Sequence, residues 1–121
     1  MKTTINLDGA ALELSANAAT PFRYKMTFGQ DLLIALASIK AEDGTLGADI
    51  SDTVSRLTYI MNKQALNKAN ELSDEDFLTW LEQIDDPMAF ITHAKDIIEF
   101  YMKNVKTASK SKNAKGPSTG K

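Results

Sequence analysis

His93 is the only histidine of the chain and the residue best suited to proton transfer or metal binding. Asp96 and Glu99 follow it along the chain, and no second histidine can join them. Zinc sites draw mainly on several histidine and cysteine ligands, so one histidine with two carboxylates does not make a ligand set. We therefore expect His93 to be a solvated or a helix-edge residue, and we expect no metal ion.

The other residue types that could do chemistry also lack a catalytic setting. The chain has no Cys, and no serine stands in the G-x-S-x-G motif that activates a nucleophile. Segment 44–47 is not a phosphate-binding loop, and the acidic run 74–76 lacks the spacing of a calcium loop. Asp85 and Asp86 could form an acid pair, but Asp86 before Pro87 is typical of a helix N-terminus. We predict that the protein is not an enzyme and carries no cofactor.

Composition and charge divide the chain into a body and a tail. Its 121 residues, 43% of them hydrophobic, suit one domain with a core of ordinary size. Residues 106–121 contain five lysines and no acid, which leaves residues 1–105 with a net charge of about −7. We expect a single helical domain over 1–105 and a disordered basic tail over 106–121. Because an acidic body repels phosphate, nucleic acid is not an expected partner of that body.

The expected location follows from the apolar segments. Residues 1–6 do not have the basic-then-apolar order of a signal peptide. The longest apolar run, 32–39, is far shorter than the roughly 18 residues that a membrane span requires. We expect a soluble protein of the cytoplasm with no membrane partner.

Two alternating patterns occupy the N-terminal part of the chain. Apolar and polar residues alternate over 3–15, and Asp8 and Gly9 divide that run with a typical hairpin turn, so we predict a β-hairpin. A second alternation over 22–28 indicates a third strand or an extended arm with its aromatic residues facing the core. The side chains that would share that face are Phe22, Tyr24, Met26 and Phe28.

The first two predicted helices lie on either side of a loop over 41–48. The first begins between residues 27 and 31 and ends near Lys40. Because it is apolar nearly all round, we expect it at the centre of the fold. The second is capped by Asp49 or Ser51, with acidic residues in its first turn. Its main apolar face consists of Ile50, Val54, Leu57, Met61 and Ala65.

Two further helices are predicted from their capping residues. Ser73 followed by Asp76 resembles a capping box at the start of a short third helix. Asp86 and Pro87 begin a fourth helix that runs to about Val105. The predicted fold is therefore mostly α with a small N-terminal β-hairpin (α+β), with about four helices in a compact bundle.

Some apolar residues fall outside the main face of each predicted helix. A single packing face needs an apolar stripe of roughly 100°, and these helices carry more than that. Such residues either pack inside the bundle against a second neighbour or form a patch that marks a contact with another protein. The candidate protein-binding residues are Tyr59, Leu66, Trp80, Ile97 and Phe100.

Two segments carry a family resemblance. An N-terminal hairpin is followed by the segment TPFRYKMTFGQDLL, and a last amphipathic helix with a Lys/Ser-rich tail is preceded by FLTWLEQID. This layout, over roughly residues 1–105, resembles the small tail assembly chaperones of siphophages and prophages of Gram-positive bacteria. The residues that carry it most clearly are Phe22, Tyr24, Phe28, Leu32, Leu33, Phe77, Trp80 and Leu81.

The resemblance implies a function and partners. Members of that family bind the long, hydrophobic tape measure protein, keep it soluble and help tail tube subunits assemble around it. They are absent from the finished virion. The resemblance thus implies a chaperone of the host bacterial cytoplasm that acts in bacteriophage tail morphogenesis, with the tape measure protein and possibly the tail tube protein as partners.

Three alternatives stay open at the level of the sequence. The first is a structural phage protein of the tail or of the head–tail junction, which would be present in purified particles. The second is a small nucleic-acid-binding protein that acts through its lysine-rich tail. The third is a host-directed phage regulator or another adaptor. The sequence predicts no particular oligomeric state.

Overall fold

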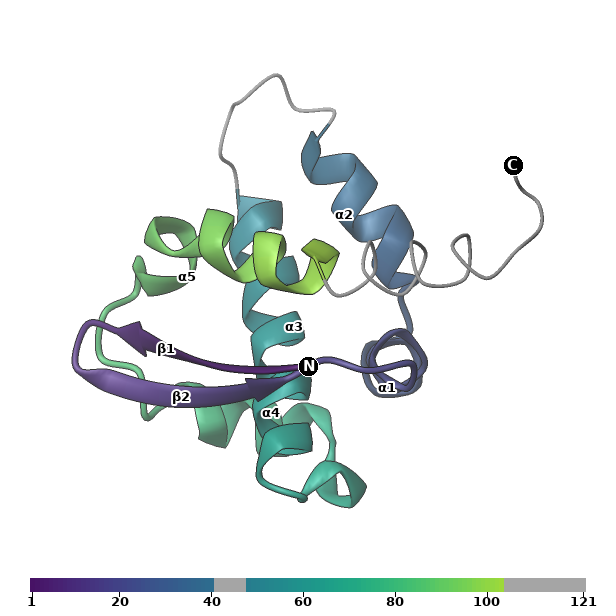
Figure 1. Cartoon of the computed structure of the whole chain (residues 1–121), viewed down its shortest axis with the longest axis horizontal. Helices are drawn as coiled ribbons and strands as arrows, with labels where there is room; N and C mark the ends of the chain where they lie inside the picture. Colours follow the sequence, from purple (N-terminus) through teal and green to yellow (C-terminus); the bar gives the residue numbers. More distant parts are fainter. Residues whose placement is uncertain (41–47, 104–121) are drawn as a thin grey trace.

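The computed structural model of the chain describes residues 1–40 and 48–103, and Figure 1 shows helices arranged around one long helix with a hairpin lying across it. The elements are β1 (Lys2–Leu7), β2 (Ala10–Ser15), α1 (Thr20–Phe28), α2 (Leu32–Lys40), α3 (Ala48–Ala65), the 3-10 helix η1 (Ala69–Glu71), α4 (Asp74–Leu81) and α5 (Ala89–Thr92). A further helical segment spans residues 94–103. The predicted fold class, mostly α with a small N-terminal hairpin, is confirmed. The predicted tail and the predicted loop, apart from Ala48, lie outside the described residues.

The predicted hairpin turn is confirmed. The φ angles of Asp8 and Gly9 are 54° and 104°, in the left-handed region that a two-residue hairpin turn uses. The Gly9 N–H donates a 2.8 Å hydrogen bond to Oδ1 of Asn6, which closes the turn. Only glycine adopts a φ angle such as that of Gly9 without strain, so this position fixes the register of both strands.

The hairpin is stabilised by packing on α3, because two strands alone are marginal in water. Leu7 and Leu14 are buried, and the antiparallel register places Ile5 opposite Leu12 on the same face. All four side chains belong to the core or pack against it. The alternation in the sequence therefore predicted the buried face correctly.

The predicted strand or arm over 22–28 is wrong, because α1 is a helix. Pro21 lies in its first turn, where a missing N–H costs nothing, and Gly29 ends it with a φ angle of 71°. The Gly29 N–H donates a 2.8 Å hydrogen bond to the Lys25 carbonyl, which is a typical helix end. Helical geometry separates the expected apolar face: Tyr24 is buried, whereas Phe22 and Met26 are exposed.

The central helix is α3 rather than α2, which corrects a second prediction. Asp31 caps α2, since its Oδ1 accepts a 3.1 Å hydrogen bond from the Ile34 N–H, and the helix ends at Lys40 as predicted. Only one side of α2 is buried, while Leu33 and Ile34 face outward. The packing partners of α3 are β2, α1, α2, η1, α4 and α5.

The start of α3 also differs from the prediction. The helix begins at Ala48, so Asp49 and Ser51 lie in its first turn and neither is its cap. Its predicted main face is confirmed in Ile50, Val54, Leu57 and Met61, which are buried. Several polar side chains of α3 are buried as well: Thr53, Ser55, Thr58, Asn62 and Gln64. Their burial shows that α3 has neighbours on nearly all sides.

The last predicted helix is interrupted. Oδ1 of Asp86 accepts a 2.8 Å hydrogen bond from the Met88 N–H, as a capping residue does, but regular helix begins only at Ala89. The helix breaks at His93 and resumes over 94–103. Nε2 of His93 lies 3.6 Å from Oδ1 of Asp8, so this break faces the hairpin turn. The predicted end at Val105 lies outside the described residues.

Candidate functional site

The five predicted protein-binding residues do not form one exposed patch. Tyr59, Trp80 and Ile97 are buried, with exposed fractions of 0, 4 and 0%. Phe100 is half-buried, and only Leu66, directly after α3, is exposed. The expectation of an outer apolar edge is therefore wrong for the three buried residues, and it fails because their helices have neighbours on more than one side.

Tyr59 is held by the beginning of α4. Its hydroxyl donates a 2.7 Å hydrogen bond to Oδ2 of Asp76 and accepts one of 3.2 Å from the Ser73 N–H. Nζ of Lys63 lies 3.0 Å from the same carboxylate oxygen. The Ser73 side chain caps α4 by accepting a 3.0 Å hydrogen bond from the Asp76 N–H, as predicted. Tyr59 thus replaces the second half of a capping box.

These contacts shift two pKa values in opposite directions. Burial raises the pKa of Tyr59 above its ordinary value of 10.0, and the hydrogen bond to Asp76 raises it further. The hydrogen bond from Tyr59, followed by that from Lys63, lowers the pKa of Asp76 below its ordinary value of 3.8. The phenol stays protonated and the carboxylate stays ionised, so the pair is structural and cannot exchange protons near neutral pH.

Trp80 belongs to an aromatic cluster between α1, α3, α4 and α5. Its ring centroid lies 5.5 Å from Tyr59 and 6.0 Å from Phe90, and Phe28 lies 5.2 Å from Phe77. Most of these contacts are edge-to-face or tilted, the arrangement that the quadrupoles of aromatic rings favour. The cluster is part of the core or packs against it, so little of these side chains is exposed.

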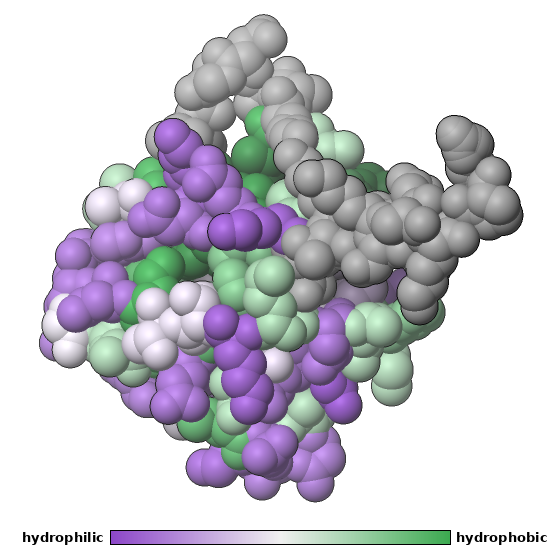
Figure 2. Space-filling view, viewed as in Figure 1, coloured by the Kyte–Doolittle hydropathy of each residue, from purple (hydrophilic) through white to green (hydrophobic). Residues whose placement is uncertain are grey.

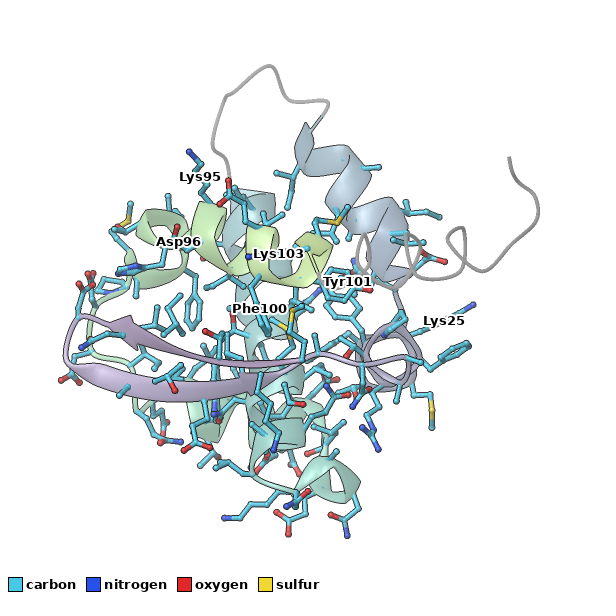
Figure 3. All side chains as sticks on the ribbon, in the orientation of Figure 1. Lys25, Lys95, Asp96, Phe100, Tyr101 and Lys103 are labelled. Atoms are coloured by element: carbon cyan, nitrogen blue, oxygen red, sulfur yellow. The ribbon has the colours of Figure 1, made fainter. Side chains whose placement is uncertain are left out.

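Phe100 lies one turn after Ile97 on the 94–103 helix, at the edge of the same buried face. Ile97 is fully buried, together with Ala94 and Tyr101 on the same face. Figure 3 shows Phe100 between this helix and the hairpin, while Lys95 and Asp96 point away from the core. Ile98, Phe100 and Met102 also pack against the core from beside this face, which explains why the apolar stripe is wider than one face requires.

The exposed apolar surface instead lies on α1 and α2. Phe22 and Met26, one turn apart on α1, expose 69 and 84% of their surface. Leu33 and Ile34, in the first turn of α2, expose 59 and 68%. Figure 2 shows apolar atoms over the region that α2 occupies in Figure 1 and along the edge formed by α1. We call these four residues the α1–α2 surface.

A shallow groove continues the α1–α2 surface toward the 94–103 helix. Its volume is about 210 Å³, and its walls are almost wholly apolar. Leu33 belongs both to this groove and to the α1–α2 surface. The groove is lined by Leu33, Leu36, Ala37, Ile39, Ile98 and Met102. Apolar side chains of another protein could bury area here without any polar partner.

Sequence reasoning missed the α1–α2 surface because of two local patterns. The alternation over 22–28 suggested one buried face, although Pro21 and Gly29 mark the start and end of a helix. Segment 32–39, which forms most of α2, is apolar nearly all round the helix. The spacing of its apolar residues therefore could not indicate which side of the helix is exposed. The helix boundaries at Pro21 and Gly29 are the signal that could have revealed the exposed pair on α1.

The described residues contain no group of three or more side chains that could hold a metal ion. No helix among them is both long enough and apolar enough to cross a membrane. His93 lies at the end of α5, as expected of a helix-edge residue, and its side chain is 22% exposed with Asp8 as its charged neighbour.

Comparison of the chain with protein-family models, with curated proteins and with solved structures finds no match.

Proposed function

We propose that this protein is a non-catalytic chaperone that binds an apolar, helical client in the bacterial cytoplasm, as a tail assembly chaperone binds the tape measure protein. The observation that carries the proposal is the α1–α2 surface, four large apolar side chains on two consecutive helices. Apolar residues gathered in this way on a small protein mark a contact with another protein. The order of elements that resembles tail assembly chaperones supports the choice of client.

The chemistry of the surface suits a chaperone. Its side chains offer area and shape without polar groups, and one of them is the flexible Met26, which can adapt to different partners. A client that is apolar along its length can then be held at many places by modest contacts. The acidic body would keep the complex in solution, since net charge opposes association between copies.

The test is co-expression with a tape measure fragment. The fragment should be soluble with the wild-type protein and insoluble with a variant carrying both Phe22→Ser and Ile34→Ser. Met88→Ser is the matched control, because Met88 is also about half exposed but lies before α5. If the fragment is equally insoluble with and without the wild-type protein, the chaperone proposal is wrong. If Met88→Ser has the same effect as the double variant, the α1–α2 surface is not the binding surface.

The composition of purified particles separates this proposal from a structural role. A chaperone is absent from the particles, whereas a tail or head–tail protein is present in a fixed ratio to the other subunits. Mass spectrometry measures the amount of this protein in purified particles and in the lysate from which they are prepared. A chaperone is found in the lysate alone, whereas a structural protein is found in both.

A further inference from the structure

A second groove lies between α3 and α4, on residues that the proposed function does not use. Its volume is about 440 Å³, and it is closed at one end by the turn that leads into α5. Six apolar side chains form most of its lining: Phe77, Leu78, Leu81, Ile84, Pro87 and Phe90. The side chains from α3 are Ser51, Asp52, Ser55 and Arg56. Leu78 is 62% exposed although it lines the groove, so apolar area is available to a ligand.

The rim of this groove is acidic. Asp52 of α3 and Asp86 of the turn before α5 both line it. Glu75 and Glu82 lie one turn before and one turn after Leu78 on α4, and both are exposed. Among the residues that the structure describes, none of these four carboxylates is in an ion pair.

Arg56 is the one cation among the lining residues, and its guanidinium is already engaged. It donates a 2.9 Å hydrogen bond to Oε1 of Gln30 and lies 5.2 Å from the centre of the Phe28 ring. Because both partners are uncharged, Arg56 keeps its positive charge, which offsets only part of the charge of the four carboxylates. The groove therefore keeps a mostly apolar lining and a net negative rim.

We propose that this groove binds an amphipathic helix of a partner protein, with leucine-sized side chains on the floor and lysine or arginine on both flanks. An amphipathic helix places apolar anchors at i, i+4 and i+7 on one side, which suits an elongated apolar groove. Basic residues beside that stripe meet Asp52, Glu82 and Asp86, so charge determines which helices bind. An acidic rim repels phosphate and anionic lipid, which leaves a basic peptide as the complementary ligand.

The site is independent of the α1–α2 surface. Its residues come from α3, α4 and the turn before α5, and none of them lies on α1 or α2. Each surface can therefore be impaired by substitution while the other is kept. Binding in the groove does not require the chaperone proposal to be correct.

The experiment uses two designed peptides with the full-length protein. Each has about 15 residues, with three leucines at the spacing above; one carries lysines on its flanks, and the other carries glutamates at the same positions. Because the chain has no Cys, Thr79→Cys next to Leu78 gives a single site for a fluorescent reporter outside the groove lining. Binding is measured as the change in reporter fluorescence.

The lysine peptide should bind, and the glutamate peptide should bind at least roughly tenfold more weakly, because several rim charges act together. Leu78→Ser and Asp52→Lys should each weaken binding of the lysine peptide, whereas Leu33→Ser on α2 should leave it unchanged. Since Leu78, Asp52 and Leu33 are exposed, these variants should keep the fold, which circular dichroism checks.

Equal binding of the two peptides, or no binding of either, overturns the proposal without any variant. It is also overturned if the protein self-associates in sedimentation and Leu78→Ser abolishes that association, because a second copy then occupies the groove. Loss of binding in Leu33→Ser would place the peptide on the α1–α2 surface instead.

Discussion

The indole N–H of Trp80 donates a 2.9 Å hydrogen bond to Oδ1 of Asn62, deep between α4 and α3. The amide nitrogen of Asn62 in turn donates a 2.8 Å hydrogen bond to the Glu13 carbonyl on β2. One side chain of the central helix thereby connects the aromatic cluster with the hairpin. Trp80 is buried because this partner satisfies its only polar atom.

Replacing Asn62 by alanine should destabilise the protein by about 2–4 kcal/mol, because a buried indole N–H and a main-chain carbonyl both lose their partner. Asn70→Ala is the matched control, since Asn70 is exposed on η1 and should change stability by less than about 0.5 kcal/mol. Urea unfolding followed by the fluorescence of the single Trp measures both values. Equal midpoints for the two variants would mean that the Asn62 contacts do not stabilise the fold.

The contact between Tyr59 and Asp76 makes stability depend on acid pH. The pKa of Asp76 is lowered in the folded protein, first by the hydrogen bond from Tyr59, so the unfolded chain takes up the proton at a higher pH. This stabilisation is fully present above the unfolded pKa of about 3.9 and is lost as the pH falls through the folded value. Tyr59→Phe should cost about 1 kcal/mol at neutral pH and should unfold with a smaller dependence on pH below about 5.

Thermal unfolding between about pH 7 and pH 3 checks this prediction. Asp74→Asn, which alters an exposed carboxylate of the same helix, should follow the wild-type curve. If Tyr59→Phe and the wild type lose stability in parallel as the pH falls, the hydroxyl does not hold the carboxylate in its ionised form.

All three tyrosines link stability to alkaline pH. Burial raises the pKa of Tyr24, Tyr59 and Tyr101 above the ordinary value of 10.0. A raised folded pKa means that this contribution to stability is complete below about pH 10 and is lost as the pH rises above it. We expect less tyrosinate absorbance at pH 10 from the folded protein than from the unfolded chain, and a cooperative rise on alkaline unfolding. The guanidinium-unfolded chain, whose tyrosines should titrate near 10, is the control, and a phenol that titrates there in the folded protein would contradict the prediction.

Features with a local cause could be predicted from the sequence. The hairpin follows from Asp8 and Gly9, whose backbone angles depend on no distant residue. The start of α4 follows from Ser73 and Asp76, three residues apart. In both cases the residues that determine the structure are neighbours in the chain.

The positions of Tyr59 and Trp80 could not be predicted in the same way. The Tyr59 hydroxyl donates a hydrogen bond to Asp76, 17 residues away along the chain, and the Trp80 indole donates one to Asn62, 18 residues away. Helical spacing left open whether such residues pack against a second neighbour or form a surface patch, and it could not show that both aromatics are buried. Asn62 and Gln64 of α3 are buried because their side chains donate hydrogen bonds to carbonyls of the hairpin strand β2. These partners are distant in the chain, so the sequence around α3 could not predict the contacts.

The clearest test of the α1–α2 surface is a pair of substitutions on α1. A strand over 22–28 would bury Phe22 and Tyr24 on one face, so replacing either would cost a similar free energy. The helix buries Tyr24, with its ring 5.3 Å from Phe28, and leaves Phe22 exposed. Tyr24→Ala should therefore destabilise the protein by about 3–5 kcal/mol, and Phe22→Ala by less than about 0.5 kcal/mol.

Urea unfolding of the two variants measures the difference, with Tyr24→Leu as a milder change if Tyr24→Ala does not fold. Because Leu keeps part of the buried volume, Tyr24→Leu should fall between the alanine variant and the wild type. Phe22→Ala should also lower aggregation at high concentration, since it removes exposed apolar area without disturbing the core. Similar losses of stability at the two positions would indicate that Phe22 is buried, and the surface on which the proposed client binds would then lack one of its four residues.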